Sequence, residues 1–171
     1  MKKLLVAAAF AALSVAPAQA QFAGAYAGAG VTMDNVHLTG DFEGFGATGI
    51  GGTAFAGYDI NMGGTFAGVE GNIDLNTADV EDVVEAKWGW GVSGRFGFTV
   101  NKSTGVYGRV GYQRNKVSDG VDSAWGDGVR FGGGVETAVA TKAALRLEFS
   151  HVDYEQDVAN NQVVAGLLMR F

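Results

Sequence analysis

Few side chains in this 171-residue sequence stand at spacings that support known chemistry. Residues 44–49, GFGATG, match the G-x-G-x-x-G pattern of phosphate-binding loops. That pattern holds a phosphate only when a strand precedes it and a helix follows it. Here an acidic segment precedes it and a strand-like segment follows, so we interpret the match as a coincidence in a chain with 28 glycines.

The two histidines, His37 and His151, offer little for metal binding or catalysis. His151 precedes Asp153 and Glu155 on one strand face, which makes at most a weak cation site, because metal sites usually need several convergent ligands. Ser150 and His151 are a nucleophile and a base, but neighbouring residues of a strand point to opposite faces. We therefore expect no enzyme, no cofactor and no metal site.

Charged side chains instead recur at every second position, opposite apolar ones. Arg146 and Glu148 alternate with Leu145, Leu147 and Phe149, and a period of two is the signature of a β-strand. The same pattern along the chain predicts eight strands, at residues 22–32, 48–58, 65–75, 87–100, 106–116, 127–139, 144–154 and 161–171. Eight antiparallel strands in an up-and-down order can close into a barrel without a free edge.

The connections between these strands alternate in length. Residues 59–64, 101–105 and 140–143 are tight turns, whereas residues 33–47, 76–86 and 117–126 are longer and polar, and residues 155–160 are shorter. An up-and-down barrel places successive connections at opposite ends. We therefore expect one end with tight turns and both termini, and a second end with polar loops.

The charged face fits the inside of such a barrel better than its outside. It carries arginine, glutamate, serine and glycine but almost no lysine, and an eight-stranded barrel is just wide enough for side chains to fill it. Buried charges need partners of opposite sign. We therefore predict a charge network in the lumen, made by Glu70, Arg95, Arg109, Arg130, Glu136, Arg146, Glu148 and Arg170.

Aromatic residues cluster near the strand ends. Those near the tight turns are Tyr58, Phe66, Phe98 and Phe171, and those near the loops are Trp88, Trp90, Tyr112 and Tyr154. Two aromatic belts flank the apolar band of membrane barrels. The alternative is a soluble barrel with an apolar interior. The belts and the inward charges favour an all-β fold, an eight-stranded antiparallel up-and-down transmembrane β-barrel.

The first twenty residues have the features of a secretory signal peptide. Lys2 and Lys3 precede an apolar stretch at residues 4–13, and Ala18 and Ala20 form a small-x-small cleavage site. Ten apolar residues are too few for a spanning helix, which needs about 20. We expect residues 1–20 to be removed, leaving residues 21–171 as an exported barrel domain with 10 basic and 18 acidic residues and no cysteine.

Two motifs resemble those of a known group. Residues 57–59 (GYD) and 68–71 (GVEG) resemble the second and third strands of small outer-membrane barrels of the opacity-protein and porin-like group, which are similar to the OmpA barrel. The resemblance covers the layout of residues 21–171 and implies the outer membrane of a Gram-negative bacterium. Larger OmpA-type proteins add a peptidoglycan-binding domain after the barrel, and we expect none here because the sequence stops at the last predicted strand.

The end of the chain resembles the C-terminal signature that the outer-membrane barrel assembly machinery reads. Leu167, Met169 and Phe171 lie on one face of the last predicted strand, and the chain ends on the aromatic residue. The resemblance therefore implies that this machinery is a partner of the chain.

Acidic residues gather in or beside the predicted loops. They are Asp34, Asp41, Glu43, Asp79, Glu81, Asp82, Glu85, Asp119, Asp122, Asp127, Asp153, Glu155 and Asp157. We expect a solvated acidic rim, which can also attract divalent cations that bridge the protein to anionic lipopolysaccharide. Such a rim argues against binding to nucleic acid.

We expect a monomeric structural protein that supports the integrity of the cell envelope and whose lumen is filled by side chains. Two alternatives remain open from the sequence. One is a small porin-like channel for small solutes, which the resemblance implies. The other is a surface protein that acts in adhesion or interaction through its acidic loops.

Deletion of Phe171 tests the C-terminal signature. We expect the deletion to lower the amount of assembled barrel far more than the small buried area of one side chain explains, because it removes the terminal aromatic residue of the signature. The measurement is the heat-modifiable band on gels of membrane fractions, with Phe171→Tyr as a control that keeps an aromatic ring. Normal assembly of the deletion variant would contradict this role.

Overall fold

The computed structural model describes residues 22–38, 46–77, 87–118, 123–155 and 158–171, so the predicted signal peptide lies outside the described residues. The described chain forms eight strands: β1 (Gly24–Leu38), β2 (Gly46–Asn61), β3 (Thr65–Thr77), β4 (Lys87–Thr99), β5 (Thr104–Ser118), β6 (Ser123–Ala138), β7 (Ala143–Tyr154) and β8 (Val158–Arg170). Among the described residues, no helix has the length and apolar character to cross a membrane.

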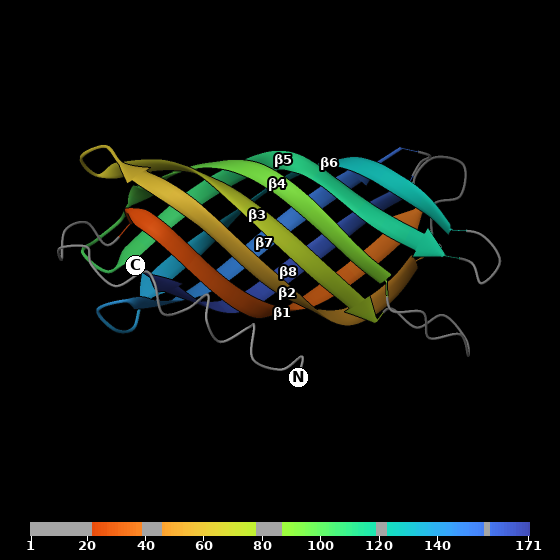
Figure 1. Cartoon of the computed structure of the whole chain (residues 1–171), viewed down its shortest axis with the longest axis horizontal. Helices are drawn as coiled ribbons and strands as arrows, with labels where there is room; N and C mark the ends of the chain where they lie inside the picture. The colour runs from red at the N-terminus through yellow and green to blue at the C-terminus, as the bar shows by residue number, and fades with distance from the viewer. Residues whose placement is uncertain (1–21, 39–45, 78–86, 119–122, 156–157) are drawn as a thin grey trace, which may run out of the picture.

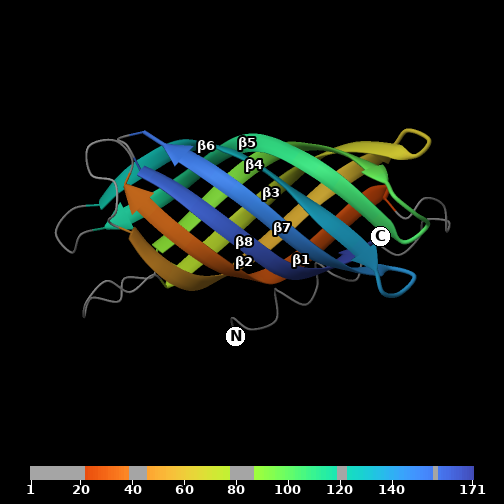
Figure 2. The same ribbon diagram turned by 180° about the vertical axis from the view of Figure 1, so that it is seen from behind.

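The strands form one closed antiparallel barrel. Each pairs with the next along the chain, and β8 pairs with β1 from Tyr26↔Arg170 to Leu38↔Val158. Figures 1 and 2 show the strands tilted around a common axis, with the tight turns and the C-terminus at one end. In the β2–β3 turn, Gly63 and Gly64 adopt positive φ angles of 74° and 104°, which glycine adopts at little cost. The predicted fold class is confirmed.

Several strands are longer than their sequence pattern predicts, mainly toward the loops. β1 continues to Leu38, β5 to Ser118, and β6 and β8 begin earlier, at Ser123 and Val158. The backbone ladder continues there although the outward residues are no longer uniformly apolar, as with Asn35 and Thr48. Apolar alternation therefore marks the apolar band of the wall, whereas backbone pairing extends beyond it.

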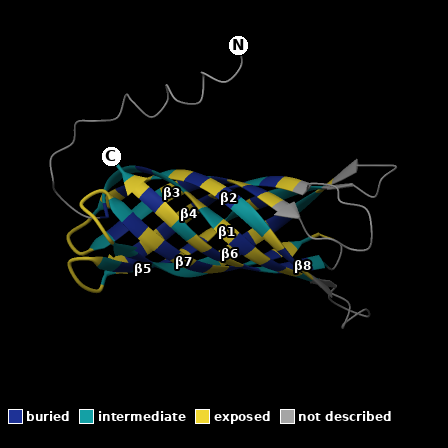
Figure 3. Cartoon of the chain, turned by 90° about the horizontal axis from the view of Figure 1, so that it is seen from below, coloured by how far each residue is buried: buried dark blue, intermediate teal, exposed yellow. Residues whose placement is uncertain are grey.

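The outer wall is apolar and the interior is polar. Val31, Ile50, Val69 and Val110 are each at least 60% exposed, while the charged residues between such positions are buried. Figure 3 shows the result as exposed and buried residues alternating along much of the strands that face the viewer. This arrangement is the reverse of a soluble barrel and leaves a wall suited to lipid.

The aromatic belts are only partly as predicted. Tyr58, Phe98, Trp88 and Tyr112 are exposed on the outer wall, and Trp90 lies on the same face with intermediate exposure. Phe171 follows the outward face of β8, and its backbone N–H donates to Ala25.

Phe66 and Tyr154 were wrongly assigned to the belts, because both point into the lumen. Phe66 is fully buried and stacks on Phe22, with ring centroids 5.3 Å apart. The Tyr154 hydroxyl accepts a hydrogen bond of 2.6 Å from the side chain of Asn115. The two-residue alternation of the strands already predicts that both rings point inward, because Phe66 lies on the same face as Glu70 and Tyr154 lies on the same face as Ser150.

Glycines opposite the lumen aromatics make room for their rings. Tyr26 pairs across the sheet with Gly57, and Phe55 pairs with Gly28. A Cβ added at Gly57 would lie 2.5 Å from the ring of Tyr26 and 2.6 Å from the Val69 carbonyl, far inside van der Waals contact. Glycine in a strand often marks such a close approach, and here it lets aromatic rings fill the narrow lumen.

Gly57→Ala tests this packing. We expect the added methyl to lower the free energy of unfolding by about 1–3 kcal/mol, as overpacking typically does, because the Val69 backbone cannot move aside. The measurement is urea unfolding of the purified protein in detergent. Gly52→Ala is the matched control: its Cβ would meet nothing closer than 3.8 Å, so equal losses at both positions would refute the explanation.

Candidate functional site

The half of the lumen nearer the tight turns holds four arginines and four carboxylates in contact, which we call the central network. Its members are Asp59, Glu70, Arg95, Arg109, Glu136, Arg146, Glu148 and Arg170. They project inward from β2, β3, β4, β5, β6, β7 and β8, and their formal charges cancel. The alternation of each strand places them on the inner face, and the register brings them within a few residues of one another along the barrel.

Arg146 and Arg95 form the centre of this network. Arg146 Nη2 lies 2.7 Å from Glu70 Oε2 and 2.8 Å from Glu136 Oε1. Arg95 Nη1 lies 2.8 Å from the same Glu136 oxygen, and its Nε lies 3.3 Å from Asp59. The two arginines therefore share carboxylates, which ties separate strands together.

Arg109 and Arg170 extend the network on either side. Arg109 Nη1 lies 3.0 Å from Glu70 and 2.7 Å from Glu148. Arg170 lies 2.9 Å from Asp59 and 2.6 Å from Glu136. Each of the four arginines thus contacts at least two carboxylates, as charges removed from water require.

Aromatic rings pack among the charged groups of the network. The guanidinium of Arg146 lies 4.0 Å from the ring centre of Phe55, and that of Arg95 lies 4.1 Å from Tyr107. The Tyr26 hydroxyl donates to Glu70 at 2.7 Å. Stacked arginines retain their planar donors for carboxylates, so the rings and the ion pairs hold each other in place.

Very little free space remains beside the network. A cavity lined by Glu70, Arg109, Arg146 and Glu148, with Asn72 and Gln162 among its other neighbours, has about 10 Å³ open to the centre of a water molecule. That is room for about one water. Within the described chain, side chains therefore fill the lumen at this height.

Arg130 does not belong to the central network, which corrects one sequence-based expectation. It lies six residues before Glu136 in β6, toward the loops, roughly 20 Å away at the usual rise of a strand. Its Nη2 contacts Asp74 at 3.1 Å and Gln162 at 3.0 Å. Arg130 therefore forms part of a second cluster nearer the loops.

This second cluster consists mainly of amides and carboxylates. Asp74 accepts hydrogen bonds from Asn72 at 2.8 Å and Gln113 at 3.0 Å. Asp34 was expected in the acidic rim but is 1% exposed inside the lumen. There it accepts from Asn160 and Gln162, both at 2.9 Å. Its place on the inner face of β1 is the physical reason for this correction.

The sequence-based prediction of the lumen omits several residues that the two-residue alternation nevertheless places on the inner face. Asp59 shares the inner face of β2 with Phe55, yet the prediction used it only as part of a turn motif. Asn72, Gln113 and Gln162 are at most 5% exposed inside the barrel. Uncharged amides carried no charge signal, so only their strand parity could have revealed them.

The serine–histidine pair is separated as predicted. Ser150 is fully buried in the lumen, whereas His151 lies on the outer face, with Nδ1 2.8 Å from Asn161 Oδ1 and its ring 5.0 Å from that of Phe131. Within the described ranges, no group of three histidines, cysteines or acids is placed to hold a metal ion.

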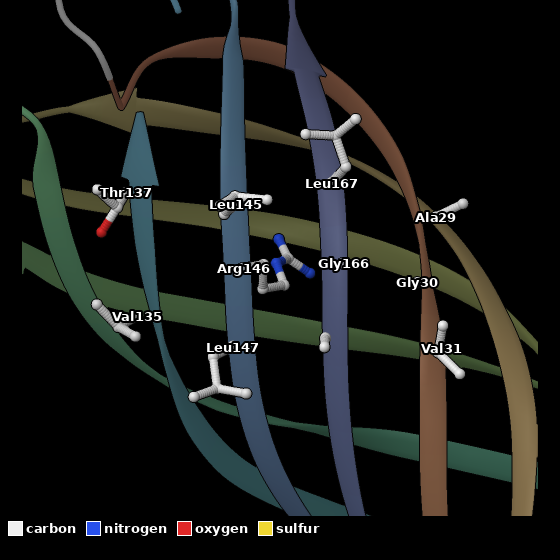
Figure 4. Close-up of a pocket in the computed structure, with 11 residues that line it drawn as sticks. Ala29, Gly30, Val31, Val135, Thr137, Leu145, Arg146, Leu147, Gly166 and Leu167 are labelled. Carbon is white, nitrogen blue, oxygen red and sulfur yellow. The ribbon is translucent and has the colours of Figure 1, made fainter. Parts of the chain in front are cut away.

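The outer wall also has a shallow hollow, which Figure 4 shows over β1, β6, β7 and β8. Ala29 and Gly166 leave it open, and Val31, Leu145 and Leu147 border it. Its lining is almost wholly apolar, so the hollow is part of the apolar wall and carries no chemistry of its own.

The model of the family described as outer membrane protein beta-barrel domain matches residues 5–171. This chain belongs to that family. It is an outer membrane β-barrel protein of a Gram-negative envelope, as the apolar wall and filled lumen predict. The resemblance noted in the sequence is thereby confirmed at the level of the family.

One relative and two solved structures place this outer membrane barrel among known proteins. It is 36% identical over 114 residues to the 22 kDa outer membrane protein of Rhizobium leguminosarum bv. viciae, covering 63% of this chain and 54% of that protein. The match thus spans about half the relative's length.

The structural likeness is to small barrels. Ail, the attachment invasion locus protein of Yersinia pestis, is 17% identical with a TM-score of 0.65, over 88% of this chain and all of Ail. Neisserial surface protein A is also 17% identical, with a TM-score of 0.63, over 89% of this chain and all of that protein. At this identity the likeness shows the shared fold.

Glu70→Gln tests the central network. We expect the free energy of unfolding in detergent to fall by about 3–5 kcal/mol, because removing one member of a buried ion pair leaves the other charge uncompensated. Urea titration followed by heat-modifiable gel mobility measures it. Asp127→Asn, which breaks an exposed pair with Arg114, should have a much smaller effect; similar losses would refute the difference between the two sites.

Proposed function

We propose that this outer membrane barrel has a structural role in envelope integrity and that its lumen does not conduct. The observation that carries the proposal is the central network, whose eight charged groups are mutually paired and nearly inaccessible to solvent. A protein that passes solutes needs a water-filled path, whereas side chains occupy this one.

A continuous path would have to disrupt two sets of buried side chains. The first is the set of aromatic residues, Phe22, Tyr26, Phe55, Phe66 and Tyr107, all at most 6% exposed. The second is the central network, in which separating one buried pair costs about 3–5 kcal/mol. Because the arginines share carboxylates, opening a gap requires several pairs to separate together.

The alternative function, a porin-like channel, is best supported by the half of the lumen nearer the loops. Polar side chains such as Asp74, Gln113 and Asn160 line that half. That half ends at the central network. The other alternative function, adhesion, would depend on the predicted loops, which lie largely outside the described residues. Ail is named for attachment and invasion, but 17% identity supports a common fold and no common partner.

We further propose that the protein is a monomer without enzymatic activity and that it contacts lipopolysaccharide through divalent cations at its acidic rim. Asp153 and Glu155 are exposed at the loop end of β7, where such cations can reach them. The barrel assembly machinery is the second partner that we propose, through Leu167, Met169 and Phe171.

Planar-bilayer conductance tests the closed lumen. We expect negligible current from the unmodified protein and measurable, steady current from Glu70→Ala or Arg95→Ala, because each truncation removes a side chain that fills the constriction. Arg114→Ala, on the outer wall, should leave the bilayer silent. A large, steady conductance from the unmodified protein would refute the proposal and favour the porin-like alternative.

A further inference from the structure

The outer wall of β4, β5 and β6 carries a group of aromatic and charged side chains near its loop end. We call it the basic aromatic patch, and its members are Trp88, Trp90, Tyr112, Arg114, Lys116, Trp125 and Asp127. It lies outside the lumen, so none of its members takes part in the central network.

The strand register places the patch at the edge of the apolar band. Tyr112 pairs with Val92 and Val129, which are exposed apolar residues of the band. The next outward residue of β5 is Arg114, which lies between Trp90 on β4 and Asp127 on β6. Apolar and charged surfaces therefore meet across one step of the strand, as expected at the boundary between lipid tails and headgroups.

Arg114 is held in a fixed orientation. Its Nε lies 3.0 Å from Asp127 Oδ1, and its guanidinium lies 5.0 Å from the ring centre of Trp125. The Tyr112 hydroxyl donates to the same Asp127 oxygen at 2.6 Å, and Trp88 meets Trp125 edge-on at 5.3 Å. Each neighbour limits how far the guanidinium can turn.

This orientation leaves donors available. Among the residues that the structure describes, the two terminal nitrogens of Arg114 have no hydrogen-bond acceptor, because the contact with Asp127 uses Nε. Lys116 lies two residues further on the same face, beside Trp125. Arg114 and Lys116 are thus two cations beside the carboxylate of Asp127, and Glu155 follows on the neighbouring chain segment, where its backbone N–H donates to the Asp127 carbonyl. Acidic residues otherwise predominate at this end of the barrel.

The patch is also distinct on the wall. On the outward positions of the described strands, Arg114 and Lys116 are the only arginine or lysine residues; Lys102 and Lys142 lie in turns at the opposite end. At the corresponding height, β1 carries Asn35, and the end of β7 carries the exposed acids Asp153 and Glu155. Arg114 and Lys116 are therefore the cationic side chains that the described wall offers to an anion at this height.

We propose that the basic aromatic patch binds a phosphate group of an outer-leaflet lipid, the phosphorylated glycolipid of the outer membrane, directly and without a bridging metal ion. A guanidinium presents two parallel donors that match phosphate oxygens, and Lys116 adds a second positive charge. The surrounding Trp and Tyr rings lie against the lipid beside its headgroup, where such rings are favoured. This site is independent of the closed lumen.

Binding of purified lipid A tests the proposal, with EDTA present to remove divalent cations. The folded protein in detergent is titrated with bisphosphorylated lipid A, and bound lipid is measured by native mass spectrometry. We expect the double variant Arg114→Gln, Lys116→Gln to bind roughly tenfold more weakly or worse. The matched control, Lys102→Gln with Lys142→Gln, removes two cations from the tight-turn end and should bind as the unmodified protein does.

The other probes distinguish the possible ligands. Dephosphorylated lipid A should bind the unmodified protein as weakly as bisphosphorylated lipid A binds the double variant, and inorganic phosphate should not compete at equal concentration. Equal binding with and without lipid phosphates, equal weakening in the control, competition by inorganic phosphate, or binding only when magnesium is restored would each overturn the proposal. Heat-modifiable mobility verifies folding, and the single variants, each expected to weaken binding about threefold, replace the double variant if it does not fold.

Discussion

The pairing of four arginines with four carboxylates in a space almost without water is the constraint on which this barrel depends. Seven strands supply these groups, and β1 supplies the Tyr26 hydroxyl that donates to Glu70. A slip of one residue between any two strands would turn a charge toward lipid and an apolar residue inward. The network therefore requires one register, and that register in turn creates the uninterrupted apolar wall.

The period of two was sufficient to predict the number of strands, their order and the faces of most residues. The assignment of residues to faces is wrong where residue type or proximity to a loop replaces the alternation as the criterion. Phe66 and Tyr154 were placed in belts because they are aromatic and near strand ends, although their parity places them in the lumen. Asp34 was counted with the loops because the apolar pattern fades before the strand ends.

Other features of the site required the register and could not be obtained from one strand at a time. Arg130 has the same face and charge as its neighbours, but its height decides that it pairs with Asp74 instead of with the central network. The clearance between Tyr26 and Gly57 likewise depends on which residues stand opposite each other. Cross-strand pairing follows from the closure of the whole sheet, which no single segment encodes.

The position of Arg170, the residue before the last, links the network to the way in which the sheet becomes complete. Arg170 pairs with Tyr26 across the β1–β8 seam and contacts both Asp59 and Glu136. Until that seam forms, these two acids lack one of their cations. A nearly finished sheet therefore retains uncompensated charge, which makes partly closed intermediates costly and makes the closing step cooperative. The ion pairs that fill the finished barrel thus also favour complete closure of the sheet over partial closure.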